Sequence, residues 1–143
     1  MKTFATLLFV TLFMISCNST KTAYKTASQV NHQEQDTVRI ANDSLEYEIL
    51  IIEPGFNSWL ATTAKPEGFY SQEYMEARNR QYVIEWNQRV LQPLRYDSNL
   101  YELQIDYQPF IDYGYEVNYK LYNYFIYFQL TYKQRLGTFA PRI

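Results

Sequence analysis

Few side chains in this sequence of 143 residues could take part in covalent or acid–base chemistry. It contains one cysteine, Cys17, and one histidine, His32. Because His32 lies in a polar segment that we expect to be a tether, we exclude a histidine-based triad, and the count excludes a metal site of several histidines. A single cysteine also excludes an intramolecular disulfide. The remaining candidates are the sulfur of Cys17 and the carboxylates.

Four carboxylates could form an acid–base pair of the kind that glycosidases use, namely Glu102, Asp106, Asp112 and Glu116. We favour structural roles, because Glu102 and Asp106 fit the solvated face of a strand and Glu116 is a favourable charge near a helix start. Asp97-Ser98-Asn99 with Glu102 offers oxygen ligands for calcium, but the spacing and the turn glycine of a calcium loop are missing, so we expect an ordinary turn. The sequence therefore predicts no enzyme, no catalytic residue, no metal site and no cofactor.

Aromatic side chains are the more prominent functional signal. The sequence has 15 tyrosines, nine of them between Tyr101 and Tyr132. One interpretation is that these rings pack the core and keep their hydroxyl groups at its rim. In the other, some rings form an open surface with Trp59 and Trp86 that stacks on a sugar or contacts a protein, and Arg78 serves an anionic ligand. We favour the core, with Trp86 inside, and keep Trp59, Trp86 and Arg78 as candidate ligand-binding residues.

The N-terminal segment has the proportions of a signal peptide. Lys2 supplies a positive charge, and residues 4–15 form an apolar stretch that is shorter than the roughly 20 residues of a membrane-spanning helix. A conventional cleavage site needs small residues in an A-x-A-like arrangement, and residue 14 is the bulky Met14. Residues 14–16 therefore do not match a conventional cleavage site.

Met14-Ile15-Ser16, followed by Cys17, resembles the lipobox of bacterial lipoproteins. This resemblance implies that residues 1–16 are a signal peptide and that Cys17 is the lipidation site. Lipoproteins of this kind carry a diacylglyceryl group, usually with an amide-linked acyl chain, and two or more chains anchor a protein stably in a membrane. The alternative is ordinary secretion with a free Cys17 thiol.

Residues 17–43 have the composition of a flexible tether. They are rich in Ser, Thr, Asn, Gln and Lys, and such a segment buries too little apolar surface to offset the entropy of ordering it. Removal of residues 1–16 takes away one lysine and leaves 12 of the 13 basic residues against 15 acidic ones. This mildly acidic balance gives no electrostatic reason to expect a nucleic acid partner.

Residues 44–143 are enough for one globular domain. Apolar and polar residues alternate in residues 45–52 and 101–107, which predicts two strands, and residues 37–40 are a candidate for a short edge strand that turns at Asn42-Asp43. The expected fold is therefore α+β, with a small antiparallel sheet of two or three strands packed against two long helices and preceded by a signal peptide and a disordered tether.

The expected helices are less uniform in their signals. Residues 56–63 could form one or two helical turns capped by Asn57 or Ser58, with Trp59 facing inward. A long helix should begin after Ser71 as N-cap and end before Pro93. Two ion pairs at a spacing of four residues, Glu76–Arg80 and Glu85–Arg89, favour it.

Residues 117–136 carry conflicting signals. Their many Tyr, Phe and Ile residues favour a strand, whereas Val117, Leu121, Phe125 and Phe128 recur at helical spacing. We favour a helix, because no Gly or Pro interrupts the segment, and because Lys133, Arg135 and Gly137 form a C-terminal signature. A strand of this length would also be unusual.

Three strings resemble an uncharacterised family of small lipoproteins from Bacteroidota, classed as a domain of unknown function. They are Leu-Glu-Tyr-Glu-Ile at 45–49, Glu-Pro-Gly-Phe-Asn-Ser-Trp-Leu at 53–60 and Asp-Tyr-Gly-Tyr-Glu-Val-Asn-Tyr at 112–119. The resemblance implies a setting and no mechanism. In that phylum, acidic residues after the lipidated cysteine resemble a signal for surface display, and residues 18–21 lack them. The implied location is the cell envelope, on the periplasmic face of the outer membrane.

Together these observations predict a membrane-anchored envelope lipoprotein that acts as a non-catalytic interaction or structural module. Its expected partners are the membrane, through the lipid anchor, and an envelope protein. The alternative function is a module that binds a glycan or a peptidoglycan fragment through exposed aromatic residues. A carboxylate enzyme is the third alternative.

Overall fold

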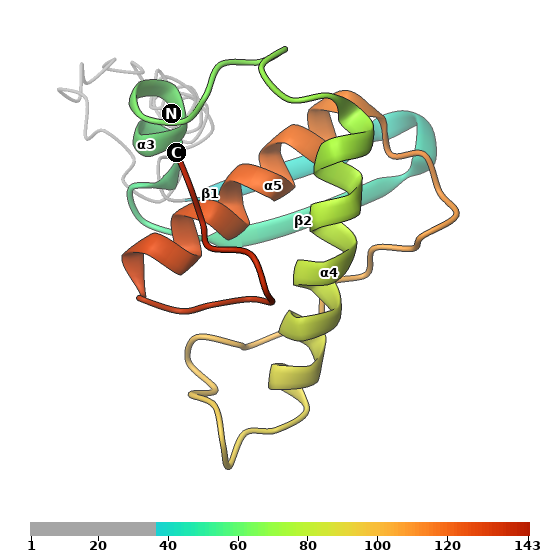
Figure 1. Ribbon diagram of the computed structural model, residues 1–143. Coiled ribbons are helices and arrows are strands. Elements are labelled where there is room, and N and C mark those ends of the chain that lie inside the picture. The colour runs from blue at the N-terminus through green and yellow to red at the C-terminus, as the bar shows by residue number, and fades with distance from the viewer. Residues whose placement is uncertain (1–36) are drawn as a thin grey trace, which may run out of the picture. The chain divides into compact units, whose positions relative to one another are not determined.

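The computed structural model describes residues 37–143, which belong to one compact unit. The expected signal peptide, Cys17 and most of the expected tether lie outside these residues. The elements are β1 (Thr37–Asn42), the 3-10 turn η1 (Asp43–Leu45), β2 (Tyr47–Ile52), α3 (Phe56–Thr62), α4 (Gln72–Val90) and α5 (Gly114–Thr131), shown in Figure 1. The fold is α+β, with one two-stranded sheet and two long helices, as predicted.

The sheet is an antiparallel pair in which β1 confirms the predicted edge strand. Val38 lies opposite Ile51 and Ile40 opposite Ile49, so these four side chains share the face that packs on the helices. Val38 and Ile40 are fully buried. The fold therefore starts at or before Thr37, and residues 37–43 belong to it, although their composition placed them in the tether.

The predicted strand at residues 101–107 is wrong, because this segment pairs with no strand. Its backbone forms hydrogen bonds with side chains of α4 instead. Asn87 accepts a hydrogen bond from Ile105 N at 2.8 Å and donates one to Ile105 O at 2.9 Å, and Trp86 Nε1 donates to Leu103 O at 2.9 Å. Tyr101 and Ile105 are buried as the alternation predicted, but Leu103 is exposed.

Helix α5 settles the conflict in residues 117–136 in favour of a helix. It lies along the sheet in Figure 1 and contacts α4, α3 and β1, so it is buried on almost every side. A helix that is apolar all round belongs in a core, which explains why its composition resembled that of a strand. It ends at Thr131, earlier than predicted. Lys133 takes the left-handed conformation (φ 52°) and Gln134 N bonds back to Gln129 O at 3.0 Å, so the chain turns without using Gly137.

Helix α4 follows its sequence signals closely. Ser71 caps it by accepting a hydrogen bond from Tyr74 N, and Met75, Tyr82 and Trp86 form its buried stripe. The chain leaves the helix after Val90, before Pro93. Both predicted ion pairs are present, with Arg80 3.8 Å from Glu76 and Arg89 2.7 Å from Glu85.

The short helix α3 begins after Gly55 rather than at Asn57 or Ser58. Gly55 has a positive φ of 84°, and a Cβ atom there would lie 3.2 Å from the Tyr127 hydroxyl, so the chain needs glycine on two counts. Trp59 is half-buried, with its ring edge-on to Tyr127 at 5.5 Å between centroids. It therefore faces inward, as predicted.

Most tyrosines pack in the core, and their hydroxyl groups fasten loops to it. Tyr127 donates to Pro54 O at 2.7 Å, Tyr119 to Lys65 O at 2.8 Å and Tyr107 to Asn118 Oδ1 at 2.7 Å. Each bond joins α5 to a segment outside the helices and strands. This confirms the core interpretation of the aromatic residues and shows how the fold holds its long connections without a disulfide.

Candidate functional site

A groove of about 840 Å³ runs along one edge of β2. All residues from Glu46 to Glu53 line one side, and residues 99–100 and 102–106 line the other. Since successive strand residues point to opposite faces, contact with every one of them places the groove at the edge of the strand. No residue of β1 lines it, so this is the edge that has no partner strand among residues 37–143. We call it the strand-edge groove.

The apolar part of the groove is aromatic and aliphatic. Trp86 from α4, Tyr124 and Phe128 from α5, and Tyr132 directly after α5 complete its lining. Leu50 and Leu103, on the two sides, are largely exposed. An exposed strand edge beside apolar side chains is a common setting for binding an extended peptide.

The charge of the groove has one sign. Its lining contains five acidic residues and no Lys or Arg, the acidic ones being Glu46, Glu48, Glu53, Glu102 and Asp106. Of these, Glu48 alone makes an ion pair within the described chain, with Arg39 of β1. The groove therefore presents an uncompensated negative charge.

Glu53 is the buried member of this acidic set. Its side chain is 6% exposed and accepts a hydrogen bond from the Tyr132 hydroxyl at 3.0 Å. Burial raises the pKa of its carboxyl group, and the bond from Tyr132 partly opposes this. A buried carboxylate without a cationic partner is costly, so a cation that entered the groove would relieve that cost.

The pKa values of two tyrosines in the lining, Tyr47 and Tyr124, are raised by burial in the groove. Burial raises the pKa of Tyr124, and the charges of Glu53 and Glu102 raise it further. Tyr47 has a buried hydroxyl group with no hydrogen-bond partner within residues 37–143, and burial raises its pKa as well. The groove therefore disfavours further negative charge.

The candidate ligand-binding residues do not gather at one place. Trp86 lines the groove, but it is only 5% exposed and its Nε1 is bonded to Leu103 O, so its ring offers no face for stacking. Trp59 and Arg78 are not part of the lining. Arg78 packs on aromatic rings, 3.3 Å from the centroid of Phe139 and 5.1 Å from that of Tyr74.

The four carboxylates that suggested an acid–base pair divide into two groups. Glu102 and Asp106 are exposed on the wall of the groove. Asp112 accepts hydrogen bonds from Gln72 Nε2 at 2.6 Å and from Gly114 N at 3.0 Å, which places it at the start of α5. Glu116 pairs with Lys120 at 2.7 Å in the first turns of the same helix. The Asp97 carboxylate accepts from Asn99 N at 2.9 Å, forming an ordinary turn.

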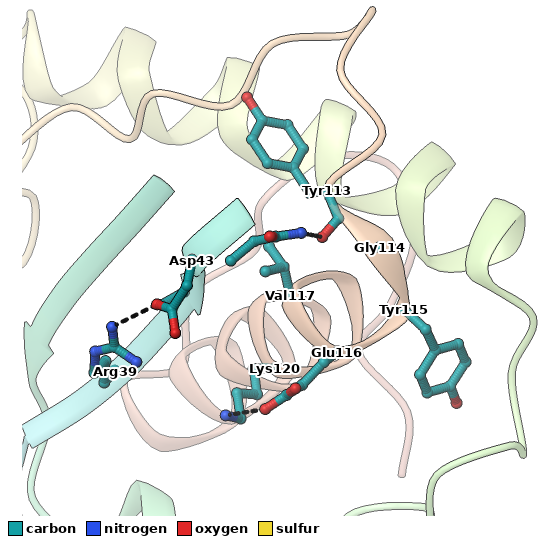
Figure 2. A pocket seen from close by; sticks show the side chains of 10 residues that line it. Arg39, Asp43, Tyr113, Gly114, Tyr115, Glu116, Val117 and Lys120 are labelled. Carbon is teal, nitrogen blue, oxygen red and sulfur yellow. Dashed lines mark hydrogen bonds and ion pairs between the residues drawn. The ribbon is translucent and has the colours of Figure 1, made fainter. Parts of the chain in front are cut away.

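A second hollow, of about 390 Å³, lies where the β1–β2 turn meets the start of α5 (Figure 2). Its charged residues already satisfy one another, because Arg39 pairs with Asp43 at 3.1 Å and Lys120 with Glu116. Asn42 closes the hollow by donating to Tyr113 O at 3.0 Å. This hollow lies between the sheet and α5, and its charged side chains are already paired with one another.

Sequence reasoning identified Trp86, Glu102 and Asp106 but not the groove that contains them. The signal that could have found it is the acidic pattern at Glu46, Glu48 and Glu53, which marks one strand, together with a second acidic alternation at 102–106. Two acidic strands are poor neighbours in a sheet, because like charges directly opposite each other are destabilising.

Within residues 37–143, no helix is long and apolar enough to cross a membrane, and no cluster of three His, Cys, Asp or Glu residues could hold a metal ion. No curated protein and no solved structure matches the chain. A family model does match, over residues 5–141, so it covers the groove as well as the N-terminal segment. The chain thus belongs to DUF6146, a family of unknown function.

Proposed function

We propose that this chain is a non-catalytic interaction module of the bacterial cell envelope, anchored in a membrane by lipid on Cys17. The lipobox-like sequence before Cys17 supports the anchor, and the resemblance to small lipoproteins of Bacteroidota supports the periplasmic face of the outer membrane as the location. The described fold begins about 20 residues after Cys17, a length of chain that would let the interaction surface stand clear of the membrane to which it is anchored.

The strand-edge groove is the observation that carries the interaction role. A long groove with exposed Leu50 and Leu103, an unpartnered strand edge and uncompensated charge is a surface that a monomeric protein normally covers or blocks. Proteins that leave such a surface accessible commonly use it to bind a partner. The groove is therefore the proposed contact surface.

Changing Cys17 tests the anchor. In the native host, the wild-type chain should begin at Cys17, carry acyl chains and stay in the membrane fraction. The Cys17→Ala variant should carry no acyl chains and should keep residues 1–16, because processing of this kind acts at the lipidated cysteine and Met14 disfavours a conventional cleavage site. Mass spectrometry of both fractions measures this, with Ser19→Ala as the control that should behave like wild type.

An intact Met1, or an unmodified thiol at Cys17 on soluble wild-type protein, would contradict the anchor. Neither result would bear on the groove. The interaction role needs a separate experiment on the described domain.

A photo-cross-linker in the groove tests the interaction role. The residue to replace is Leu103, which lines the groove and is 76% exposed, so the change should not disturb folding. On irradiation in cells, it should form a discrete adduct with a partner protein. The matched control is Leu94, which is also exposed and lies outside the groove. Equal cross-linking from Leu94 and Leu103, or none from either, would reject the interaction role of the groove.

A further inference from the structure

The unpartnered edge of β2 can accept another strand. Every residue of β2 borders the groove. In the facing segment, 102–106, backbone groups of Leu103 and Ile105 form hydrogen bonds with side chains of α4. In this arrangement the segment does not pair with β2. The volume of the strand-edge groove, about 840 Å³, is within the range of about 300–1,000 Å³ found for ligand-binding clefts.

The two faces of the sheet dictate the side chains that an added strand would need. On the inner face, its residues would lie next to the half-buried Ile49 and Ile51 of β2, over the buried rings of Trp86, Tyr124 and Phe128, which favours apolar side chains. On the outer face, they would lie beside Glu48, Leu50 and Ile52 of β2, with Glu102, unpaired within the described chain, across the groove. Lys or Arg side chains suit this face, because their aliphatic stems can cover Leu50 and Ile52 while the charged ends reach the carboxylate. An alternation of apolar and basic residues satisfies both faces.

Charge also distinguishes between possible occupants. A second copy of the chain would bring the same five carboxylates to the groove, and nucleic acid would bring phosphates, so both meet repulsion. A basic segment would meet attraction along the walls.

We infer that the strand-edge groove binds an extended segment of a partner protein in which basic and apolar residues alternate, and that this segment adds to β2 as a third strand. This inference rests on the proposed interaction role and specifies the chemistry of the partner. Backbone hydrogen bonds to β2 supply part of the affinity, and the carboxylates select the sign of the charge.

A synthetic peptide provides the test. The probe is a capped peptide of alternating lysine and valine with the six-residue length of β2, titrated into the full processed chain in detergent and followed by calorimetry. It should bind, and the same peptide with glutamate in place of lysine should not. Methylation of alternate peptide nitrogens, which removes backbone donors, should weaken binding by about tenfold or more.

Charge reversal in the groove provides the matched variants. Glu102→Lys should weaken binding of the Lys-Val peptide by about tenfold, whereas Glu67→Lys, at an exposed site outside the groove, should change it little. Equal binding of the lysine and glutamate peptides, or no effect of Glu102→Lys or of N-methylation, would overturn the inference.

Other occupants would be recognised by different results. A dimer that must dissociate before the peptide binds would assign the groove to a second copy, and tighter binding after deletion of residues 18–36 would assign it to the chain's own N-terminal segment. Either result overturns the inference. If Leu103 captures a partner in cells but the peptide does not bind, the strand inference fails alone. If the peptide binds but Leu103 captures no more than Leu94, the proposed cellular role fails alone.

Discussion

Raising the pH from about 9 to about 12 should unfold the domain in a steep transition. Burial raises the pKa of Tyr107 to about 12, and it also raises the pKa values of Tyr47, Tyr122 and Tyr124. In the unfolded chain these hydroxyl groups lose their protons near pH 10, while in the folded chain they keep them. The unfolded state then binds fewer protons, so the free energy of unfolding is undiminished below pH 10 and falls as the pH rises above it.

The expected size of this alkaline effect is large. Each such tyrosine removes up to about 1.4 kcal/mol per pH unit, so four together can remove about 5 kcal/mol within one unit. That is comparable with the whole stability of a domain, about 5–15 kcal/mol. Far-UV circular dichroism and tyrosinate absorbance should change together. Tyr122→Phe should make the transition less steep, and smooth tyrosine titration near pH 10 with unchanged dichroism would contradict the burial of these hydroxyl groups.

Arg89→Ala should destabilise the domain by about 3 kcal/mol. Arg89 is 8% exposed and is shared between segments distant in sequence: it donates to Glu85 at 2.8 Å, to the Tyr101 hydroxyl at 2.7 Å and to Arg135 O. Its guanidinium also lies 4.8 Å from the ring centroid of Tyr96. Removing it takes this donor from Glu85, Tyr101 and Arg135 O, and it loosens the attachment of the segments around residues 101 and 135 to α4. Urea denaturation measures the loss.

The control is the second ion pair of the same helix. Arg80 is half exposed and lies 3.8 Å from Glu76, so Arg80→Ala should cost less than about 1 kcal/mol. Arg89→Lys should fall between the two, because an ammonium group keeps the charge but not the planar set of donors. If Arg80→Ala and Arg89→Ala have equal effects, the bonds of Arg89 to the loops contribute nothing to stability.

These two pairs show what local sequence patterns can and cannot predict. The spacing of Glu76–Arg80 and Glu85–Arg89 predicts both contacts, because four residues bring side chains together on any helix. It cannot distinguish the buried pair from the exposed one. Arg89 is buried by Tyr101 and by residues 134–135, which reach it only through the tertiary fold.

The helices and the first two strands could be predicted because their signals are local. An N-cap at Ser71, the alternation in β2 and the uninterrupted run of α5 each act over a few residues. The end of α5 could not be predicted, because Lys133 takes a conformation that is more usual for glycine.

The strand-edge groove was not predictable because it results from a pairing that does not form. The alternation in residues 101–107 is real in terms of burial, since Tyr101, Ile105 and Tyr107 are inside. Alternation predicts an extended chain but not its hydrogen-bond partner. Here the amide of Asn87 replaces a neighbouring strand, and the space next to β2 remains accessible.

The acidic lining of β2 has a further consequence for how copies of this protein behave when crowded. A bare strand edge beside Leu50 and Ile52 is the kind of template on which proteins polymerise into fibrils. In a parallel, in-register contact along this edge, the form found in many fibrils, Glu46 and Glu48 of each copy would lie beside those of the next, and the mutual repulsion disfavours growth of an aggregate. The carboxylates thus oppose aggregation through the exposed edge of β2.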